Sequence, residues 1–138
     1  MRLLCFLAKR FRWKSHSKTL ADAVDADVEQ QLRDCVVAFV HAEPKDELEG
    51  AQARALRHAL KHLKWMANKR ELTNVVLHSF THLGTESAAP AFAEAFLAEL
   101  AARLSGTGYD VACTPFGYFC EWDLEVHGES LAKVFKEI

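Results

Sequence analysis

The residues best suited to chemistry in this sequence follow an apolar run at positions 75–80. That run, VVLHSF, has the β-branched and apolar composition of a strand covered on both faces. Thr81, His82 and Glu86 come directly after it and supply a hydroxyl, an imidazole and a carboxylate. Because ligands of open α/β sheets bind at the carboxyl ends of strands, we expect a site at this corner. The alternative is structural: His82 caps the loop, and His78 fills the core.

Other motifs that would specify a reaction are absent. The glycines form neither GxGxxG nor GxxxxGK[ST], and no GxSxG marks a serine nucleophile. Cys120 paired with His82 would make a thiolate nucleophile, but nothing around Cys120 favours it over an inert, half-buried thiol. His58 and His62 stand one helical turn apart without the glutamate of HExxH, which favours a solvated helix face over a metal site. We therefore expect no metal and no cofactor.

Length and composition are typical of a single globular domain. The chain has 138 residues, of which 50% are hydrophobic and 26% are charged, so it can bury one core without disulfides. The four cysteines show no CxxC pair and no zinc spacing, which favours reduced thiols and a cytoplasmic location. No apolar run approaches the ~20 residues of a membrane span, so we expect no membrane partner.

Charge is uneven along the chain although the net charge is only −2. That net value argues against nonspecific coating of nucleic acid. The start of the chain is nevertheless basic, with Phe11 and Trp13 between its cations. Such a ribbon is suited to holding a phosphate backbone and stacking a base, and it is equally typical of an edge strand protected by charge. The cations are Arg2, Lys9, Arg10, Arg12, Lys14 and Lys18.

The hydrophobic pattern predicts an α/β fold in the broad sense, an α+β domain with a mixed sheet. Two consecutive strands near the end of the chain exclude a purely alternating parallel arrangement, and one domain is expected over residues 1–138. The connection at residues 15–31 is expected to be polar and largely irregular. Strands are predicted at residues 2–14, 34–42, 75–80, 109–113 and 118–126, and helices at residues 46–68, 90–104 and 130–137.

Two long stretches resemble the editing domain at the amino terminus of archaeal threonyl-tRNA synthetases. They are SFTHLGTESAAPAFAEAFLAELAARLSGTGYDV and TPFGYFCEWDLEVHGESLAKVF. The shared pattern is a strand entering a His-Leu-small-x-Glu corner, a proline-started helix, a Gly-[FY]-x-V strand, a Pro-Phe-Gly-Tyr motif and a closing HG-x-x-Leu-Ala segment. In spacing the resemblance covers nearly the whole chain.

The resemblance implies the fold of D-aminoacyl-tRNA deacylases, a homodimer, no metal, and hydrolysis of serine wrongly esterified to threonine tRNA. A synthetic site built for threonine gains little binding energy from one methyl group, so binding alone cannot exclude serine. A second, hydrolytic site must therefore remove it. Because this chain carries no synthetase modules, we expect it to act in trans on aminoacyl-tRNA. Two alternatives remain open: removal of D-amino acids from tRNA on the same fold, and a noncatalytic module that binds adenosine or RNA.

The resemblance also assigns substrate contacts. His82 and the main chain around Thr81 would hold the terminal adenosine and the aminoacyl group, with Glu86 beside them. The walls of the pocket would come from the motif that follows the second helix. Its members are Pro115, Phe116, Gly117, Tyr118 and Phe119.

Four polar positions depart from the family pattern. Cys120 stands where the family carries lysine, and Lys133 where it carries glutamate. Leu7 and Lys9 stand where the family tends to show histidine and aspartate. We therefore expect His82, Lys133 and Cys120 to form the catalytic set, with Lys133 or Lys9 supplying the displaced positive charge and Lys133 and Cys120 exchanging charge across one pocket.

Overall fold

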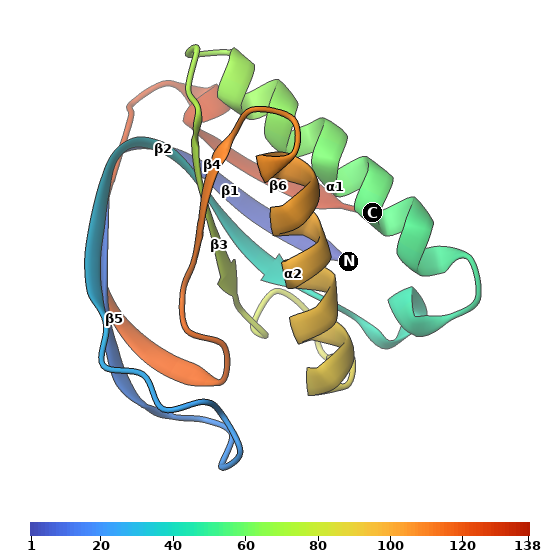
Figure 1. Ribbon diagram of the computed structural model, residues 1–138. Helices are drawn as coiled ribbons and strands as arrows, with labels where there is room; N and C mark the ends of the chain where they lie inside the picture. The colour runs from blue at the N-terminus through green and yellow to red at the C-terminus, as the bar shows by residue number, and fades with distance from the viewer.

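The computed structural model describes all 138 residues as one mixed sheet with two helices packed on it (Figure 1). This architecture confirms the predicted fold class. Short 3₁₀ turns at Pro44–Glu47 and Ser130–Ala132 precede α1 and β6. Neither α-helix is both long and apolar enough to cross a membrane. In chain order the elements are β1 (Arg2–Lys18), β2 (Glu29–His41), α1 (Ala51–Asn68), β3 (Asn74–Ser79), α2 (Pro90–Ser105), β4 (Asp110–Cys113), β5 (Tyr118–Val126) and β6 (Lys133–Glu137).

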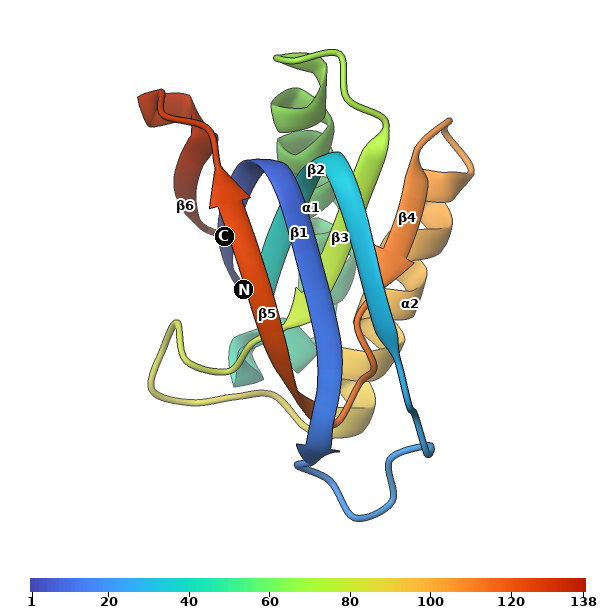
Figure 2. The ribbon, with the colours of Figure 1, turned by 90° about the vertical axis from the view of Figure 1, so that its left-hand side faces the viewer.

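The strands lie in the order β4-β3-β2-β1-β5, and β6 also pairs with β1. The β1–β2 hairpin is antiparallel, whereas β2, β3 and β4 are mutually parallel and are joined through α1 and α2. Strand β1 changes partner along its length: residues 2–6 pair with β6, and residues 8–18 pair with β5. Figure 2 shows β1, β2 and β5 running side by side along the molecule.

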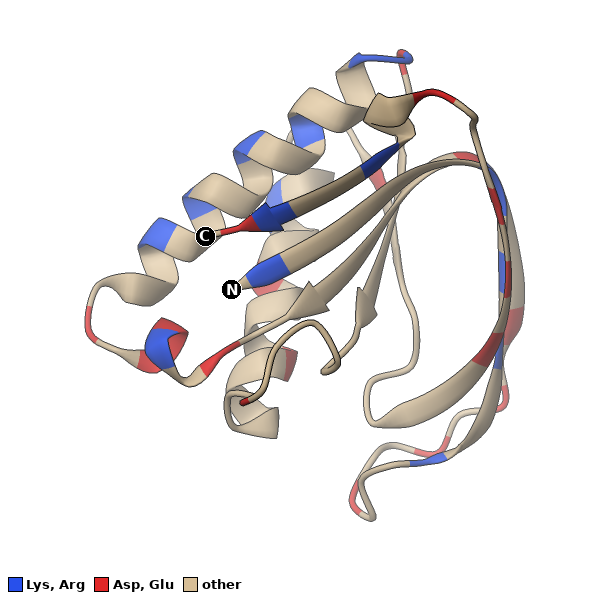
Figure 3. Ribbon diagram, turned by 180° about the vertical axis from the view of Figure 1, so that it is seen from behind, with Lys and Arg blue, Asp and Glu red and all other residues tan.

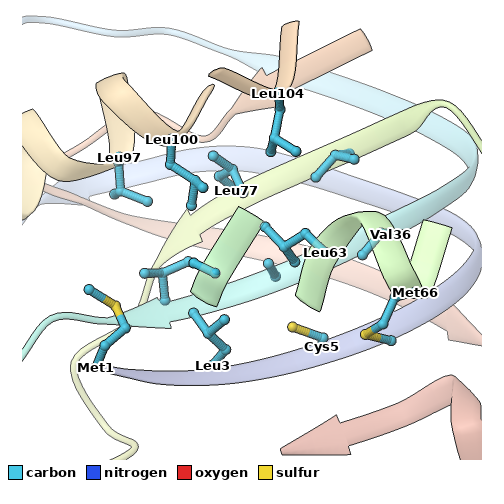
Figure 4. Close-up of a cluster of buried hydrophobic side chains, with 14 of the residues drawn as sticks. Met1, Leu3, Cys5, Val36, Leu63, Met66, Leu77, Leu97, Leu100 and Leu104 are labelled. Atoms are coloured by element: carbon cyan, nitrogen blue, oxygen red, sulfur yellow. The ribbon is translucent and has the colours of Figure 1, made fainter. Parts of the chain in front are cut away.

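The first hydrophobic core lies between the sheet and the two helices (Figure 4). Because successive side chains of a strand point to opposite faces, alternate residues of β1 and β2 reach this core, among them Leu3, Cys5 and Val36. From the helices, Leu63 and Leu100 meet them, and both are fully buried. This packing fixes β3, whose carboxyl end carries the expected site.

A second core lies on the opposite face of the sheet, where the far half of the hairpin bends back (Figure 1). Phe11 and Trp13 from β1 are fully buried there and cluster with Phe39 and Val76. They are therefore unavailable to stack a base. Since β1 lies between β2 and β5, it is not an edge strand either, and both interpretations of the basic start of the chain are wrong.

Three segments differ from the sequence-based prediction. The helix expected at residues 46–68 begins only at Ala51, because Pro44–Glu47 form a separate 3₁₀ turn. The expected irregular connection shrinks to residues 19–28, because β1 continues to Lys18 and β2 begins at Glu29, with Lys14 paired to Glu29 in the register. The expected closing helix is instead a 3₁₀ turn followed by β6. Its backbone completes the edge that β5 leaves open along residues 2–6 of β1.

Candidate functional site

A cavity of about 480 Å³ opens at the carboxyl end of β3. The strand end at Phe80 and the segment 115–119 line it together, as the sequence predicted, and the start of α2 and the loop after β1 complete its wall. The lining residues are Thr19, Leu20, Ala42, His78, Ser79, Phe80, Thr81, His82, Ser87, Ala88, Pro90, Ala93, Pro115, Phe116, Gly117, Tyr118, Phe119, Cys120 and Trp122.

Most of the predicted site residues line this cavity, but Glu86 and Lys133 do not. The side chain of Glu86 is exposed, and this residue contributes its backbone carbonyl to the wall of the loop. Lys133 is exposed on β6, and its Nζ donates to the carbonyl of His127 at 3.0 Å. Lys133 and Cys120 therefore do not face each other across one pocket, and the predicted exchange of charge between them is wrong.

The two altered positions of the first strand also lie outside the cavity. Leu7 is buried in the core under the helices, and Lys9 is exposed to solvent. Lys9 therefore does not supply a positive charge to the site. The strand alternation predicts Leu7 to be buried but does not reveal which end of β1 approaches the cavity.

The corner after β3 is held by His41, a residue that the sequence analysis did not single out. The backbone N–H of Leu83 donates to Nδ1 of His41 at 3.2 Å, so Nε2 carries the ring proton. That nitrogen lies 3.0 Å from both the carbonyl oxygen of Glu86 and the hydroxyl of Ser87. The signal available in the sequence was a single histidine at the end of an otherwise apolar strand, and the structure buries it fully.

Two further contacts tie the corner to the ends of β1 and β2. Arg2 donates from Nη1 to the carbonyl of Leu83 at 2.9 Å, and the N–H of Ala88 donates to the carbonyl of Ala42 at 2.9 Å. A Cβ atom on Gly84 would lie only 3.2 Å from Cε1 of His41, so a larger residue there would require His41 to shift. The polar corner is therefore a fixed wall of the cavity.

The deepest polar group of the cavity is His78. It is 6% exposed, and its Nδ1 lies 2.7 Å from the hydroxyl of Thr114. Thr114 is itself held by its N–H, which donates to the carbonyl of Leu77 at 3.1 Å. Burial lowers the pKa of His78 to about 4, so the ring is neutral near pH 7. His78 thus fills the core, as the structural alternative held, and also lines the site.

Aromatic rings surround this histidine. The ring centroid of Phe39 lies 5.0 Å from that of Phe80 and 5.2 Å from that of Trp122, and Phe80 lies 5.2 Å from His82. Trp122 is 38% exposed and therefore keeps part of its ring open to the cavity. Trp122 was missed in the sequence, although the strand period places it on the same face as Cys120.

The Pro-Phe-Gly-Tyr motif packs against the loop at residues 19–28. Gly117 has φ +77°, and a Cβ atom on it would come within 2.9 Å of the Cβ of Ala23. Its carbonyl accepts the N–H of Thr19 at 2.7 Å, and the hydroxyl of Tyr118 accepts the N–H of Ala26 at 2.9 Å. Only glycine fits this conformation at so close an approach, which explains its place in the motif.

The whole chain, residues 1–138, matches the family described as the Archaea-specific editing domain of threonyl-tRNA synthetase. The chain belongs to this family. It is 26% identical over 140 residues to a threonine–tRNA ligase of Thermofilum pendens, with coverage of 100% of this chain and 22% of the relative. A threonine–tRNA ligase of Methanococcus maripaludis is 29% identical over 117 residues, with coverage of 84% and 18%. The editing domain thus spans about a fifth of the length of these relatives.

Solved structures confirm the fold of this editing domain. The structure titled c-Myc DNA Unwinding Element Binding Protein superposes with a TM-score of 0.71 at 11% identity, covering 100% of this chain and 99% of the other. A probable eukaryotic D-amino acid tRNA deacylase superposes with a TM-score of 0.57 at 12% identity, covering 98% and 96%. At these identities the similarity concerns the fold alone.

The cavity of this editing domain contains no lysine, arginine, aspartate or glutamate. Burial raises the pKa of Cys120, so its thiol is protonated near pH 7 and is a poor nucleophile. No group of three or more His, Cys, Asp or Glu side chains is placed to hold a metal ion. The hydrogen-bonding resources of the site are therefore its imidazoles, its hydroxyls and its backbone.

Unused backbone donors stand on two sides of the cavity. The N–H groups of Thr81 and His82 at the corner, and of Phe116 and Gly117 in the motif, donate to no acceptor within the protein. All four residues line the cavity. Such donors suit a ligand that brings carbonyl, hydroxyl or ring-nitrogen acceptors.

Proposed function

We propose that this domain hydrolyses the ester of serine mischarged on threonine tRNA, acting in trans in the cytoplasm. The observation that carries the proposal is the cavity at the end of β3. Residues from both segments of the family pattern contribute to its wall. Its volume of about 480 Å³ falls in the range of small-ligand pockets, ~300–1,000 Å³. A pocket of this size accommodates a nucleoside carrying a small amino acid.

The aromatic side chains of the cavity suit the terminal adenosine. Flat ring faces are available at Phe80, His82 and Trp122, and a purine base can stack on them without an ionic contact. Because the pocket contains no lysine, arginine, aspartate or glutamate, selection rests on shape and hydrogen bonds. The hydroxyls of Thr19 and Ser79 make no hydrogen bond within the protein and would meet the polar atoms of the ribose or the amino acid.

Hydrolysis in this pocket needs a positioned water, a proton acceptor and donors for the oxyanion. Water attacks the ester carbonyl carbon, and its proton passes to the imidazole of His82 or to the neighbouring hydroxyl of the substrate's ribose. The developing oxyanion accepts hydrogen bonds from free N–H groups of Thr81 and His82 or of Phe116 and Gly117. The C–O ester bond then breaks, and the ribose oxygen takes up a proton.

The domain is proposed to work as a two-fold dimer, as the family resemblance implies. The outer edges of β4 and β5 have no partner strand within the chain. Unpaired strand edges favour association with a second copy. Light scattering at dilute concentration tests this proposal, and a monomer mass would contradict it.

Deacylation of three substrates, measured side by side, tests the activity: seryl-tRNA(Thr), threonyl-tRNA(Thr) and a D-aminoacyl-tRNA. We expect seryl-tRNA(Thr) to be hydrolysed fastest. Replacing His82 by alanine should slow this reaction by about 10²- to 10⁴-fold, the usual range for losing a general acid–base. The matched control is His16→Ala, since His16 is exposed and lies outside the cavity.

Three outcomes would contradict parts of the proposal. Loss of the ester at the buffer rate alone would exclude hydrolysis and leave a binding module. Preferential hydrolysis of the D-aminoacyl ester would make the domain a chiral proofreader. A full rate in the His82→Ala variant would assign catalysis to the backbone and the substrate's own ribose.

A further inference from the structure

Helix α1 has a basic outer face in a protein whose net charge is negative. Residues 51–70 contain six lysines and arginines and no acid, whereas the rest of the chain carries eleven cations against nineteen acids. Figure 3 shows lysine and arginine positions recurring along α1, and Arg54, Arg57 and Lys61 are exposed. The six cations are Arg54, Arg57, Lys61, Lys64, Lys69 and Arg70.

Five of these six cations have no acidic partner, and one of the five, Lys69, lies over the ring of Trp65 instead. No ion pair or side-chain hydrogen bond in the protein involves Arg54, Arg57, Lys61 or Lys64, although Arg70 pairs with Glu129. Arg10 and Arg12 on the sheet differ, since each contacts acidic side chains of neighbouring strands. Residues three and four apart share a helix face, so the four unpaired cations form one stripe, which we call the α1 stripe.

An aromatic pair lies beside the α1 stripe. Trp65 is 41% exposed, and its ring stacks on that of His62 with a centroid separation of 5.8 Å and an interplanar angle of 25°. Lys69 lies over the ring of Trp65, with its Nζ 5.3 Å from the ring centroid. The Nε2 atom of His62 is buried without a partner in the protein. Exposed aromatic faces among cations are typical of surfaces that bind nucleic acid backbones.

We infer that the α1 stripe binds the phosphate backbone of the tRNA whose 3′ end enters the cavity. This inference rests on the proposed function. The cavity contains no cation, so attraction of a polyanion must come from another surface of the domain. From Arg54 to Lys64 the helix rises ~15 Å, which matches about four phosphates of one strand.

RNA fits these observations better than an acidic protein surface does. A protein interface usually combines charges of both signs around an apolar centre, whereas the α1 stripe is uniformly basic. The stripe also lies outside the cavity, which leaves the cavity free for the aminoacyl end. A tRNA is large enough to reach both places at once.

The first test compares two triple variants. Arg57→Gln/Lys61→Gln/Lys64→Gln removes three charges from the α1 stripe, and Lys9→Gln/Lys14→Gln/Arg33→Gln removes three exposed charges from β1 and β2 that form no ion pair within 4 Å. Glutamine is a good helix former, so α1 is retained. Binding of tRNA that carries no amino acid is measured by fluorescence anisotropy at several salt concentrations.

The α1 variant should bind tRNA about 10- to 100-fold more weakly at physiological salt, and its slope of log K against log salt should fall by about 2. The β1–β2 variant should lose less than about threefold, since it changes only the long-range field. Equal losses in the two variants would overturn the inference. Parental affinity in the α1 variant would also overturn it and would favour an acidic protein as the partner of this face.

The second test separates the α1 stripe from the cavity. Seryl-adenosine reaches only the cavity, so the α1 variant should hydrolyse it with the parental kcat/KM while showing a raised KM for seryl-tRNA. Equal loss on both esters would place the defect in the cavity and overturn the inference. If the parent hydrolyses neither ester, the proposed function fails, and the anisotropy series still decides whether the α1 stripe binds RNA.

Discussion

The inner and outer faces of the curved half of the sheet come from alternate residues of the same strands, yet they are built from different chemistry. The inner face carries Phe11, Trp13 and Trp122, of which the first two are fully buried. On the outer face, Arg10 and Arg12 are paired with acids whose side chains are 51–61% exposed. The contrast indicates that the buried inner face, rather than the charged outer face, stabilises the fold and positions its site.

Burial explains the contrast. Apolar area removed from water stabilises the fold by ~25 cal/mol per Å², whereas ion pairs that remain in solvent are screened and contribute little. The inner face also supports the cavity, because the ring of Phe39 packs against His78, which lines it. Substitutions on the inner face should therefore change both stability and activity, and those on the outer face should change neither.

The largest effect is expected for Phe39→Ala on the inner face. Phe39 is 4% exposed and contacts the rings of Phe6, His78, Phe80 and Trp122. Its removal leaves a cavity, so the free energy of unfolding in urea should fall by ~3–5 kcal/mol. Phe135→Ala is the matched control, because Phe135 is 52% exposed. Similar losses of unfolding free energy in the two variants would contradict the expectation that buried residues contribute more to stability than exposed ones.

The next effect concerns pH and His78. Burial lowers the pKa of His78 from its ordinary value of 6.5 to about 4. At a pH between these two values, His78 is protonated in the unfolded chain and neutral in the folded chain. The stability associated with the neutral ring is intact above pH 6.5 and is lost as the pH falls toward 4, by ~3 kcal/mol in all.

His78→Gln removes this titration, so the stability advantage of the parent over the variant should shrink between pH 7.5 and pH 4.5. Thermal or urea unfolding at the two pH values measures the change. His58→Gln is the control, since His58 is exposed on α1. An advantage that stays constant with pH would mean that folding does not lower the pKa of His78.

A smaller effect is expected for Gly117→Ala in the motif that walls the cavity. A φ of +77° disfavours alanine, and its Cβ would meet Ala23 at 2.9 Å. We expect a loss of ~1–3 kcal/mol in unfolding free energy and a raised KM for the ester substrate. Gly128→Ala offers the comparison, because nothing lies within 4 Å of its added Cβ and its φ is not in the left-handed region.

The smallest effect is expected for Arg12→Gln on the outer face. Its guanidinium contacts Glu29, Glu121 and Asp123, and the hydrogen bonds to Glu29 and Glu121 raise its pKa. These partners are exposed, so the melting temperature should stay within the scatter of replicate scans, in low and in high salt. A clear drop in low salt would show that the outer ion pairs act as a stabilising network.

Local patterns predicted most of the fold. The apolar run that became β3 and the helix started by Pro90 lie within two residues of their predicted bounds. Strand β6 was missed because its five residues acquire a partner only at the opposite end of the chain, where residues 2–6 of β1 leave an edge open. Strand formation depends on such distant partners more than helix formation does.

The site divides in the same way. Thr81, His82 and Phe116 follow recognisable motifs, and the structure places them in one cavity. His41 and the His78–Thr114 pair depend on contacts between strands that no local pattern specifies. Lys133 was placed in the site because it stands where the family pattern carries glutamate, but it lies on β6 outside the cavity, and its segment was expected to be a helix.

The change of partner along β1 also constrains the order in which the chain acquires its structure during synthesis. Residues 2–6 leave the ribosome before the strand that covers their outer edge, residues 133–137, which is made more than a hundred residues later. Contacts so distant in sequence slow folding. Until β6 arrives, an apolar strand edge that includes Leu3 and Cys5 stays open to other nascent chains. The same edge would reopen if β6 detached, so shortening the chain by this one strand should promote aggregation before it changes the chemistry of the cavity.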